Sequence, residues 1–221
     1  MRQFIEHIMS LPKTLWINFR SLPIRHAVKL PIWVSWRTKF VSLRGKIILE
    51  TPVRFGMLRF GFGGAATTKH MPCVIENNGI IIAGEKSYFG GGCQICTISP
   101  KSVIKIGKEC KFMGECHIVS AKEVIFGDKC MVSWNTQIMD TDMHSIKHLN
   151  EYCNPDSTIR IEDHVWICSR VAVMKGTTVK SGAILSCGSI IYGKCDSNAV
   201  YTGLPLRKLK DNVEWGEQYW D

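Results

Sequence analysis

Long apolar runs are absent from this sequence, and their absence excludes a membrane-spanning helix. A spanning helix needs roughly 18 to 20 apolar residues in succession, but cations interrupt the apolar residues near the N-terminus every few positions. No apolar signal segment led by Arg or Lys opens the chain either, so we expect a cytoplasmic protein. The interrupting cations are Lys13, Arg20, Arg25, Lys29 and Arg37.

The two cysteine pairs of a structural zinc site are also absent, although the chain has ten cysteines. Disulfide frameworks belong to short secreted chains, and a structural zinc site of this kind needs two ligand pairs. Cys93 and Cys96 have the C-x-x-C spacing, but no second pair completes a site. We therefore expect reduced cysteines that mostly fill the core, and no bound metal.

Acidic residues are nearly missing from the first 46 positions, which hold nine Lys or Arg and the single acid Glu6. Because Pro12, Pro23 and Pro31 divide this region into pieces too short for one helix, we expect an irregular basic segment over residues 1–70. Its aromatics either bind an anionic membrane surface or cap the open end of the fold. No nucleic-acid-binding module is found. The aromatics are Trp16, Phe19, Trp33, Trp36 and Phe40.

What the sequence does contain is a period of six. From Ile161 it reads IEDHVW, ICSRVA, VMKGTT, VKSGAI, LSCGSI and IYGKCD, with an aliphatic residue opening each unit. Neither a helix nor an ordinary strand has this period, whereas short strands joined by tight corners do. Three such sides close a coil of about 18 residues, and stacked coils bury their aliphatics in a continuous column. The same spacing occurs upstream at Phe89, Ile95, Ile106, Phe112, Ile118, Phe126, Val132 and Ile138.

The fifth place of each unit lies near a corner and holds small or β-branched residues. Half of the cysteines occupy it, which explains them as packing residues. We expect an all-β, single-stranded parallel β-helix over residues 71–205, with a loop insertion near 141–158 where the register lapses, and a short tail over 206–221. The cysteines at the fifth place are Cys93, Cys110, Cys116, Cys130 and Cys195.

Three segments carry a resemblance to a known family: NTQIMDTDMHSI, DHVWICSRVAVMKGTTVKSGAILSCGSI and the tail YTGLPLRKLK. Together with the hexads they resemble the maltose/galactoside O-acetyltransferase branch of the hexapeptide-repeat acyltransferases, over about Ile80 to Lys210. The basic N-terminal segment is similar at most to that of some polysaccharide O-acetyltransferases. The resemblance implies left-handed coiling, a homotrimer, acetyl-coenzyme A as donor and a saccharide or lipid-linked saccharide as acceptor.

The resemblance assigns the catalytic base to His144, in the loop. Transfer of an acyl group to a hydroxyl needs a base, and neutral imidazole has a suitable pKa. The alternative is a loop histidine that only makes local hydrogen bonds. Asp140 and Asp142 lie close enough in sequence for one of them to orient the imidazole, as carboxylates do in hydrolase triads, although Asp142 could instead cap the loop.

For the donor, Ser169 and Cys187 match family positions whose backbones meet the pantetheine arm. Arg207 and Lys210 match positions that meet the nucleotide end, and Lys194 and Lys208 could assist. The alternative for the cations of the tail is a solvated basic segment.

For the acceptor, Trp166 matches a Trp that borders the family's cleft, and packing between subunits is the alternative. Trp134 suits either role, and Asn135 opens one of the matching segments. The galactoside branch has an acceptor-binding Asn where this chain has Glu115, and a Lys where it has Gly193, so the identity of the acceptor cannot be carried over.

These residues favour an O-acetyltransferase of surface polysaccharide or lipopolysaccharide synthesis, in the cytoplasm and peripheral to the inner membrane face. An N-acyltransferase of amino sugars or amino acids would use the same fold and donor. A β-helix metalloprotein of the γ-carbonic anhydrase kind is less favoured, because it would need His117, His144 and His148 to cluster by chance. The loop histidine argues against an inactive scaffold.

Overall fold

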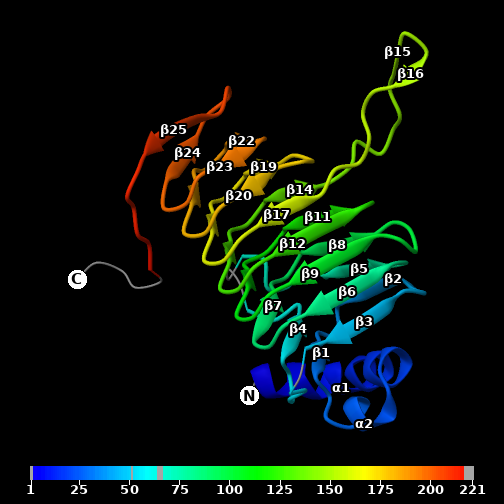
Figure 1. The fold of residues 1–221 in the computed structure, drawn as a ribbon. Helices are drawn as coiled ribbons and strands as arrows, with labels where there is room; N and C mark the ends of the chain where they lie inside the picture. Colours follow the sequence, from blue (N-terminus) through cyan, green and yellow to red (C-terminus); the bar gives the residue numbers. More distant parts are fainter. Residues whose placement is uncertain (1, 51, 64–66, 217–221) are drawn as a thin grey trace.

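The computed structural model describes residues 2–50, 52–63 and 67–216, without the side chains of residues 2–4. Its strands stack into three flat parallel sheets, which we name A, B and C, and the chain visits them in the repeating order A, B, C. This is the left-handed parallel β-helix that the resemblance implies, and Figure 1 shows it as a column of coils.

Each sheet contains one strand from every coil, and the order of strands within a sheet follows the chain. Sheet A contains β1 (Ile32–Val34), β4 (Leu58–Phe60), β7 (Ser87–Phe89), β10 (Lys111–Phe112), β13 (Met131–Val132), β18 (Trp166–Ile167), β21 (Ile184–Leu185), β24 (Val200–Thr202) and the antiparallel β25 (Arg207–Lys210). Sheet B contains β2 (Lys39–Leu43), β5 (Val74–Asn77), β8 (Gln94–Thr97), β11 (His117–Ser120), β14 (Gln137–Met139), β19 (Ala172–Val173) and β22 (Ile190–Ile191). Sheet C contains β3 (Lys46–Leu49), β6 (Ile80–Ala83), β9 (Val103–Ile106), β12 (Glu123–Phe126), β17 (Ile159–Ile161), β20 (Thr178–Val179) and β23 (Lys194–Cys195).

The core is a set of ladders in which each hexad's first residue packs on its equivalent in the next coil. In sheet A the rings of Phe60, Phe89 and Phe112 stack, with centroids 5.0 and 4.3 Å apart. Val132 and Ile167 continue this ladder in register. The predicted hexads from Ile161 to Ile191 are confirmed, because each of their opening residues is at most 1 % exposed.

At the corners between sheets, the fourth place of the hexad adopts a left-handed backbone conformation. At the corner from sheet A to sheet B, Glu115, Asn135 and Arg170 all have positive φ, at 50°, 58° and 59°. Gly188 occupies the same place one coil later with φ of 73°. Glycine adopts this left-handed conformation without strain, and the other residues accept some strain to turn the chain tightly.

The N-terminal region differs from the expectation of an irregular segment. Helix α1 (Arg2–Ser21) contains Pro12 in its interior, and α2 (Ile24–Ala27) follows it. The prediction that the prolines would prevent one helix was wrong here. Packing compensates for the hydrogen bond lost at Pro12, because α1 lies along the edge strand β1 at the end of the coil stack (Figure 1).

The contacts between α1 and β1 use polar side chains. Asn18 donates from Nδ2 to the carbonyl of Ile32 at 2.7 Å and accepts from its N–H at 3.1 Å. Thr14 makes the equivalent pair with Val34 at 3.3 and 3.2 Å. The helix therefore satisfies the backbone edge that would otherwise be open to a further strand.

The strand stacks run across residue 70, since β1 to β4 already belong to the three sheets. Part of the region expected as a leader is thus coil. The division of the chain into units at residues 70 and 205 stays a prediction.

Candidate active site

The corner between sheets A and B gathers five of the residues that the sequence suggested for donor and acceptor. Trp134, Ser169 and Cys187 hold the third place of the sheet A hexad in successive coils, and Glu115 and Asn135 hold the fourth place. Backbone hydrogen bonds link successive turns, from Arg170 N–H to the Trp134 carbonyl at 3.1 Å and from Gly188 N–H to the Ser169 carbonyl at 3.0 Å. We call this set of five residues the corner column.

The corner column is accessible and chemically quiet. Trp134 is 45 % exposed, Cys187 is exposed and Ser169 is half-buried. Behind it, burial and, second, the neighbouring Cys187 raise the pKa of the Cys168 thiol to about 11. A thiol with that pKa stays protonated at neutral pH, so Cys168 is a packing residue rather than a nucleophile.

The cations of β25 divide into engaged and available ones. Lys208 bridges the carboxylates of Asp196 and Asp211 at 2.9 and 3.0 Å, and both raise its pKa above the ordinary value. Arg207 and Lys210 are exposed and form no ion pair within the described residues. These two therefore fit a phosphate ligand better than Lys208 does.

Lys194 is not brought to this site. It lies on β23 in sheet C, exposed beside Asp196, whose pKa it helps to lower after the larger effects of Lys208 and Tyr201. The corner between sheets A and B lies opposite sheet C in the three-sided coil stack.

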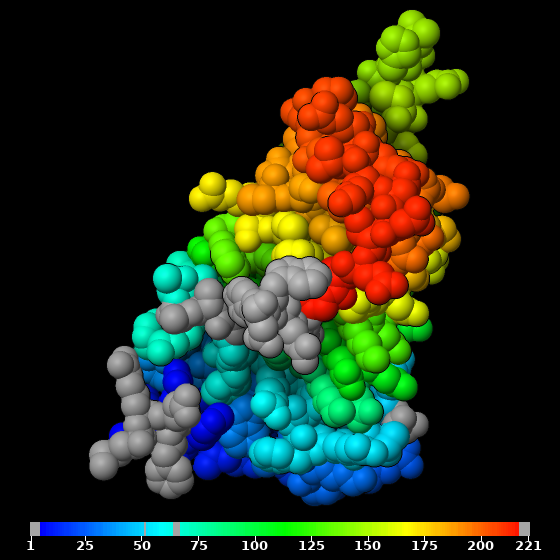
Figure 2. All heavy atoms as spheres, turned by 90° about the vertical axis from the view of Figure 1, so that its left-hand side faces the viewer, coloured from blue at the N-terminus to red at the C-terminus, as the bar shows by residue number. Residues whose placement is uncertain are grey.

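The loop that carries His144 leaves the coil after β14 and returns at β17, at the corner between sheets B and C. It is an antiparallel hairpin of β15 (Lys147–His148) and β16 (Glu151–Tyr152) that projects from the coil stack (Figures 1 and 2). Leu149 and Asn150 make the turn, with φ of 46° and 67°. Two successive positive φ values are the signature of the tight turns that close two-residue hairpins. The sequence predicted the loop but not this hairpin.

Two residues that the sequence did not single out anchor the loop at its base. Lys175, at the same corner one coil later, donates to Asp142 Oδ2 at 2.6 Å and to the carbonyl of Asn154 at 3.0 Å. Asn154 donates to Asp142 Oδ2 at 2.9 Å and to the carbonyl of His144 at 2.8 Å. These contacts lower the pKa of Asp142, Lys175 more than Asn154. No signal in the hexads points to Asn154, because it lies outside the register.

Asp140 is fully buried where the loop begins. Its carboxylate accepts hydrogen bonds from the N–H groups of Ala121, Lys122 and Glu123 and from the hydroxyl of Ser120. It therefore fastens the loop to the corner of the preceding coil.

His144 itself is exposed, and no described group hydrogen-bonds to its imidazole. Both candidate partners are engaged elsewhere, Asp140 with the backbone of the preceding corner and Asp142 with Lys175 and Asn154. An orienting role for either carboxylate stays a prediction.

Trp166 lies on the outer face of sheet A beneath the C-terminal tail. Its indole N–H donates to the Ser133 hydroxyl at 3.3 Å, and its ring lies 5.7 Å from that of Trp215. Trp215 stacks on His164 at 4.2 Å and donates from Nε1 to the His164 carbonyl at 2.9 Å. One side of Trp166 is thus covered by the chain's own tail, which lies on the face shown in Figure 2.

Within one chain, the loop and the corner column are not brought together. The loop leaves at the corner of sheets B and C, the column follows the corner of sheets A and B, and sheet B separates them. The three histidines that a metalloprotein of the γ-carbonic anhydrase kind would need lie on β11, in the loop and on β15. The described residues contain no group of three side chains that could hold a metal ion.

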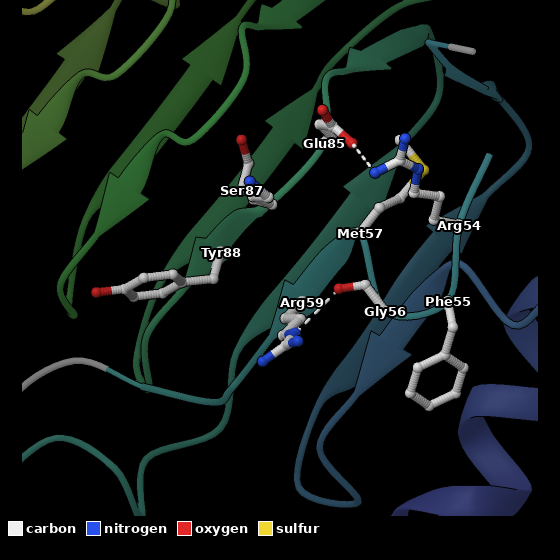
Figure 3. Close-up of a pocket in the computed structure, with 9 residues that line it drawn as sticks. Arg54, Phe55, Gly56, Met57, Arg59, Glu85, Ser87 and Tyr88 are labelled. Carbon is white, nitrogen blue, oxygen red and sulfur yellow. Dashed lines mark hydrogen bonds and ion pairs between the residues drawn. The ribbon is translucent and has the colours of Figure 1, made fainter. Parts of the chain in front are cut away.

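A hollow of about 300 Å³ lies away from all of these residues, near the N-terminal end of sheet A (Figure 3). Arg54 and Glu85 pair across it at 3.6 Å, and Arg59 donates to the carbonyl of Gly56 at 2.9 Å. None of the candidate catalytic, donor or acceptor residues lines it.

No family model matches the chain, but curated proteins and solved structures do. The chain is 26 % identical over 149 residues to a putative lipopolysaccharide biosynthesis O-acetyl transferase, WbbJ, of Escherichia coli, which covers 63 % of this chain and 76 % of that protein. It is 25 % identical to the polysialic acid O-acetyltransferase of Neisseria meningitidis, over 65 % of this chain and 67 % of that protein.

Among solved structures, the polysialic-acid-specific acetyltransferase NeuO superposes with a TM-score of 0.56 at 20 % identity, over 85 % of this chain and 90 % of that one. This likeness concerns the fold. Together with the sequence relatives, it confirms the expected resemblance to O-acetyltransferases built on the β-helix.

Proposed function

We propose that this chain is an acetyl-coenzyme A-dependent O-acetyltransferase of the hexapeptide-repeat family, acting on a saccharide hydroxyl in the synthesis of a surface polysaccharide or lipopolysaccharide. The observation that carries the proposal is the combination of an exposed histidine on an anchored loop with an accessible column of turns on the same coil stack. The names of two sequence relatives describe O-acetyltransferases, which supports the proposal.

His144 is the proposed catalytic base. Its imidazole accepts the proton of the acceptor hydroxyl as the oxygen attacks the acyl carbon. Because no described group occupies the imidazole, it is available to an acceptor. Asn154 fixes the backbone at His144, so the position of the base depends on Asn154 and Lys175. Asp142 holds this anchor and is the nearer of the two candidate orienting carboxylates in sequence.

The donor supplies an acetyl thioester. Ser169 and Cys187 are proposed to line its arm along the corner column, and Arg207 and Lys210 to bind its phosphates. The fit rests on exposed turns beside a half-buried serine and on two cations at the C-terminal end of sheet A that form no ion pair within the described part of the chain. Lys208 supports β25 through its carboxylate partners, and Lys194 is at most an accessory cation.

The acceptor is proposed to lie between Trp134 and Trp166, whose rings offer flat apolar faces to a sugar. Glu115 and Asn135 can hydrogen-bond sugar hydroxyls from the adjacent turns. Both stand in a left-handed backbone conformation, with Asn135 exposed and Glu115 half-buried.

The enzyme is proposed to be a homotrimer. Sheet B separates the loop from the corner column in one chain, so a complete site requires that the loop of one copy reaches the column of another. Three copies close such a head-to-tail contact into a ring. Light scattering at micromolar concentration is expected to report a trimer, and a monomer would contradict the shared site.

We place the reaction in the cytoplasm at the inner face of the membrane, with a lipid-linked saccharide as one acceptor. All ten cysteines are free thiols, which suits a reducing compartment. The aromatic and basic N-terminal region suits a membrane surface.

The function is tested by incubating the protein with acetyl-coenzyme A and a panel of saccharides, and by measuring released thiol together with the mass of the product. An increase of one acetyl group that mild base or hydroxylamine removes identifies an ester, as proposed. A stable amide would assign the chain to N-acyl transfer instead. The absence of thiol release with every saccharide would contradict the proposal.

A further inference from the structure

Helix α1 turns its polar side toward the coil that it covers and its apolar side outward. Its inner side is polar: Thr14 and Asn18 pair with β1, the Ser10 hydroxyl accepts from the N–H of Trp36, and all three are fully buried. Its outer side carries Ile5, Ile8, Met9, Leu15, Trp16 and Phe19, each between 44 % and 51 % exposed.

Members of this set recur one, three, four and seven residues apart, so they form one helix stripe of the kind that normally faces a core. Ile17 supplies the buried apolar contact on the inner side. The outer stripe therefore contributes little to the core of this chain, and another apolar phase must account for it.

The apolar surface continues onto α2. Ile24 and Val28 are 74 % and 60 % exposed, and α2 packs against α1. We call the outer residues of α1 together with Ile24 and Val28 the outer face. The two helices lie at the end of the molecule opposite the C-terminal coils (Figure 1).

Charge decides what covers this face. Arg20, Arg25 and Lys29 are exposed on or beside the two helices. The one acid of the first 46 residues, Glu6, is paired with Arg37 at 2.7 Å. A second copy docked face to face would bring two surfaces of the same positive sign together. Anionic lipid supplies both the apolar phase and the opposite charge.

We propose that the outer face docks on an anionic lipid surface and stands the coil stack on the membrane. Within the described residues no helix is long and apolar enough to cross a bilayer, and the proposal is for a helix lying in the interface. The docking itself follows from the outer face alone, while its use for a lipid-linked acceptor rests on the proposed function.

Docking fixes the height of the active-site loop. From β1 to β13 sheet A rises by four strand steps, and the loop leaves the coil that contains β13. At about 4.8 Å for each step, the base of the loop stands about 20 Å above β1, and farther still from the outer face of the helices that cover β1. The acceptor hydroxyl is thus expected some sugar units away from the lipid, rather than on the unit next to it.

Sedimentation with lipid vesicles tests the docking. Full-length protein is expected to sediment with vesicles of phosphatidylcholine containing phosphatidylglycerol, and much less with phosphatidylcholine alone. The double variant Leu15→Ser/Phe19→Ser, at two exposed positions, should lower the partition coefficient by about tenfold or more. Arg25→Gln/Lys29→Gln should lower it by about fivefold for each cation removed.

The matched control is Leu149→Ser/Leu209→Ser, which removes two exposed leucines far from α1 and should bind as the unmodified protein does. Equal binding by the Leu15/Phe19 variant, or no binding by the unmodified protein, would overturn the proposal. So would an oligomer larger than a trimer that the Leu15/Phe19 variant alone dissolves, because the occupant would then be a second copy. Thermal unfolding confirms that each variant is folded. Binding of coenzyme A without vesicles tests the proposed function separately.

Discussion

In the coils on either side of residues 141–158, every sixth side chain is buried against its equivalent in the next coil, whereas from Asp142 to Cys153 every side chain of the loop is exposed. The coils are stabilised by ladders of apolar side chains and backbone hydrogen bonds. The loop is fixed at its base by a few polar contacts, from Asp140, Asn154 and Lys175.

This difference suggests that the coils provide stability, while the loop provides the proposed catalytic group. A stacked coil resists change because each residue contacts two neighbouring coils, so it offers a rigid column of turns for a ligand. The loop has little to lose in packing and can therefore carry an exposed histidine away from the coils, as the proposed shared site requires. The four expectations that follow each change one side of this comparison.

The largest effect is expected from the loop. His144→Ala should lower turnover by about 10²- to 10⁴-fold, the usual contribution of a general base, with coenzyme A affinity nearly unchanged. His148→Ala, which removes an exposed imidazole four residues away, is the control and should retain activity. Steady-state kinetics and calorimetric titration with coenzyme A check this. Unmodified turnover in the His144 variant would reject it as the base.

In the coil, stability should respond rather than chemistry. Leu185→Ala creates a cavity in the sheet A ladder and should lower the free energy of unfolding by about 2 to 5 kcal/mol. Leu149→Ala, at the 84 % exposed tip of the hairpin, should change it by less than about 0.5 kcal/mol. Urea denaturation followed by circular dichroism measures both. Equal losses would show that the hairpin is packed as firmly as the coil, for example against another copy.

A smaller effect is expected at β25, which carries the proposed phosphate-binding cations. Arg207→Ala should weaken coenzyme A binding about ten- to a hundredfold by removing a charge-assisted contact to phosphate, with turnover at saturating donor less affected. Lys101→Ala, an exposed cation in the turn between β8 and β9, is the control. If dephospho-coenzyme A and coenzyme A were weakened equally, Arg207 would not contact the phosphate that distinguishes them.

The smallest effect concerns the anchor of the loop. Lys175→Met removes the hydrogen bonds to Asp142 and Asn154 and should speed proteolysis within the loop by about two- to fivefold, because such partly exposed pairs contribute little. Lys175→Arg should restore much of the protection. The anchor also depends on pH. The pKa of Asp142 is lowered from its ordinary value of 3.8, so the contact is complete above that pH and is lost as the pH falls through the lower folded-state value. Protection that does not decrease as the pH falls below 3.8, measured with a protease that is active in acid, would contradict this assignment.

Two features were predicted poorly, for physical reasons. Pro12 marks a helix break by local rules, but Asn18 and Thr14 pair the edge of β1 and hold the helix together across it. The hairpin carries no strong turn signal, since Leu149 rarely adopts positive φ and only Asn150 suits it. Asn154 and Lys175 were missed as anchors because they meet only after the chain has made a further coil.

The sequence alone determined the coil. A period of six with aliphatic first places and small fifth places admits one way to bury its apolar residues, and Ile161 to Ile191 do so in register. It also determined that His144 stands outside this register and that cations gather in the tail. Only the tertiary structure decided which of them are engaged: Lys208 pairs with Asp196 and Asp211, whereas Arg207 forms no ion pair among the residues that the structure describes. The tertiary structure alone placed the loop and the corner column on different edges of the three-sided coil stack. The position of each corner depends on how many residues each coil uses. Contacts between coils cannot be recognised in a linear repeat.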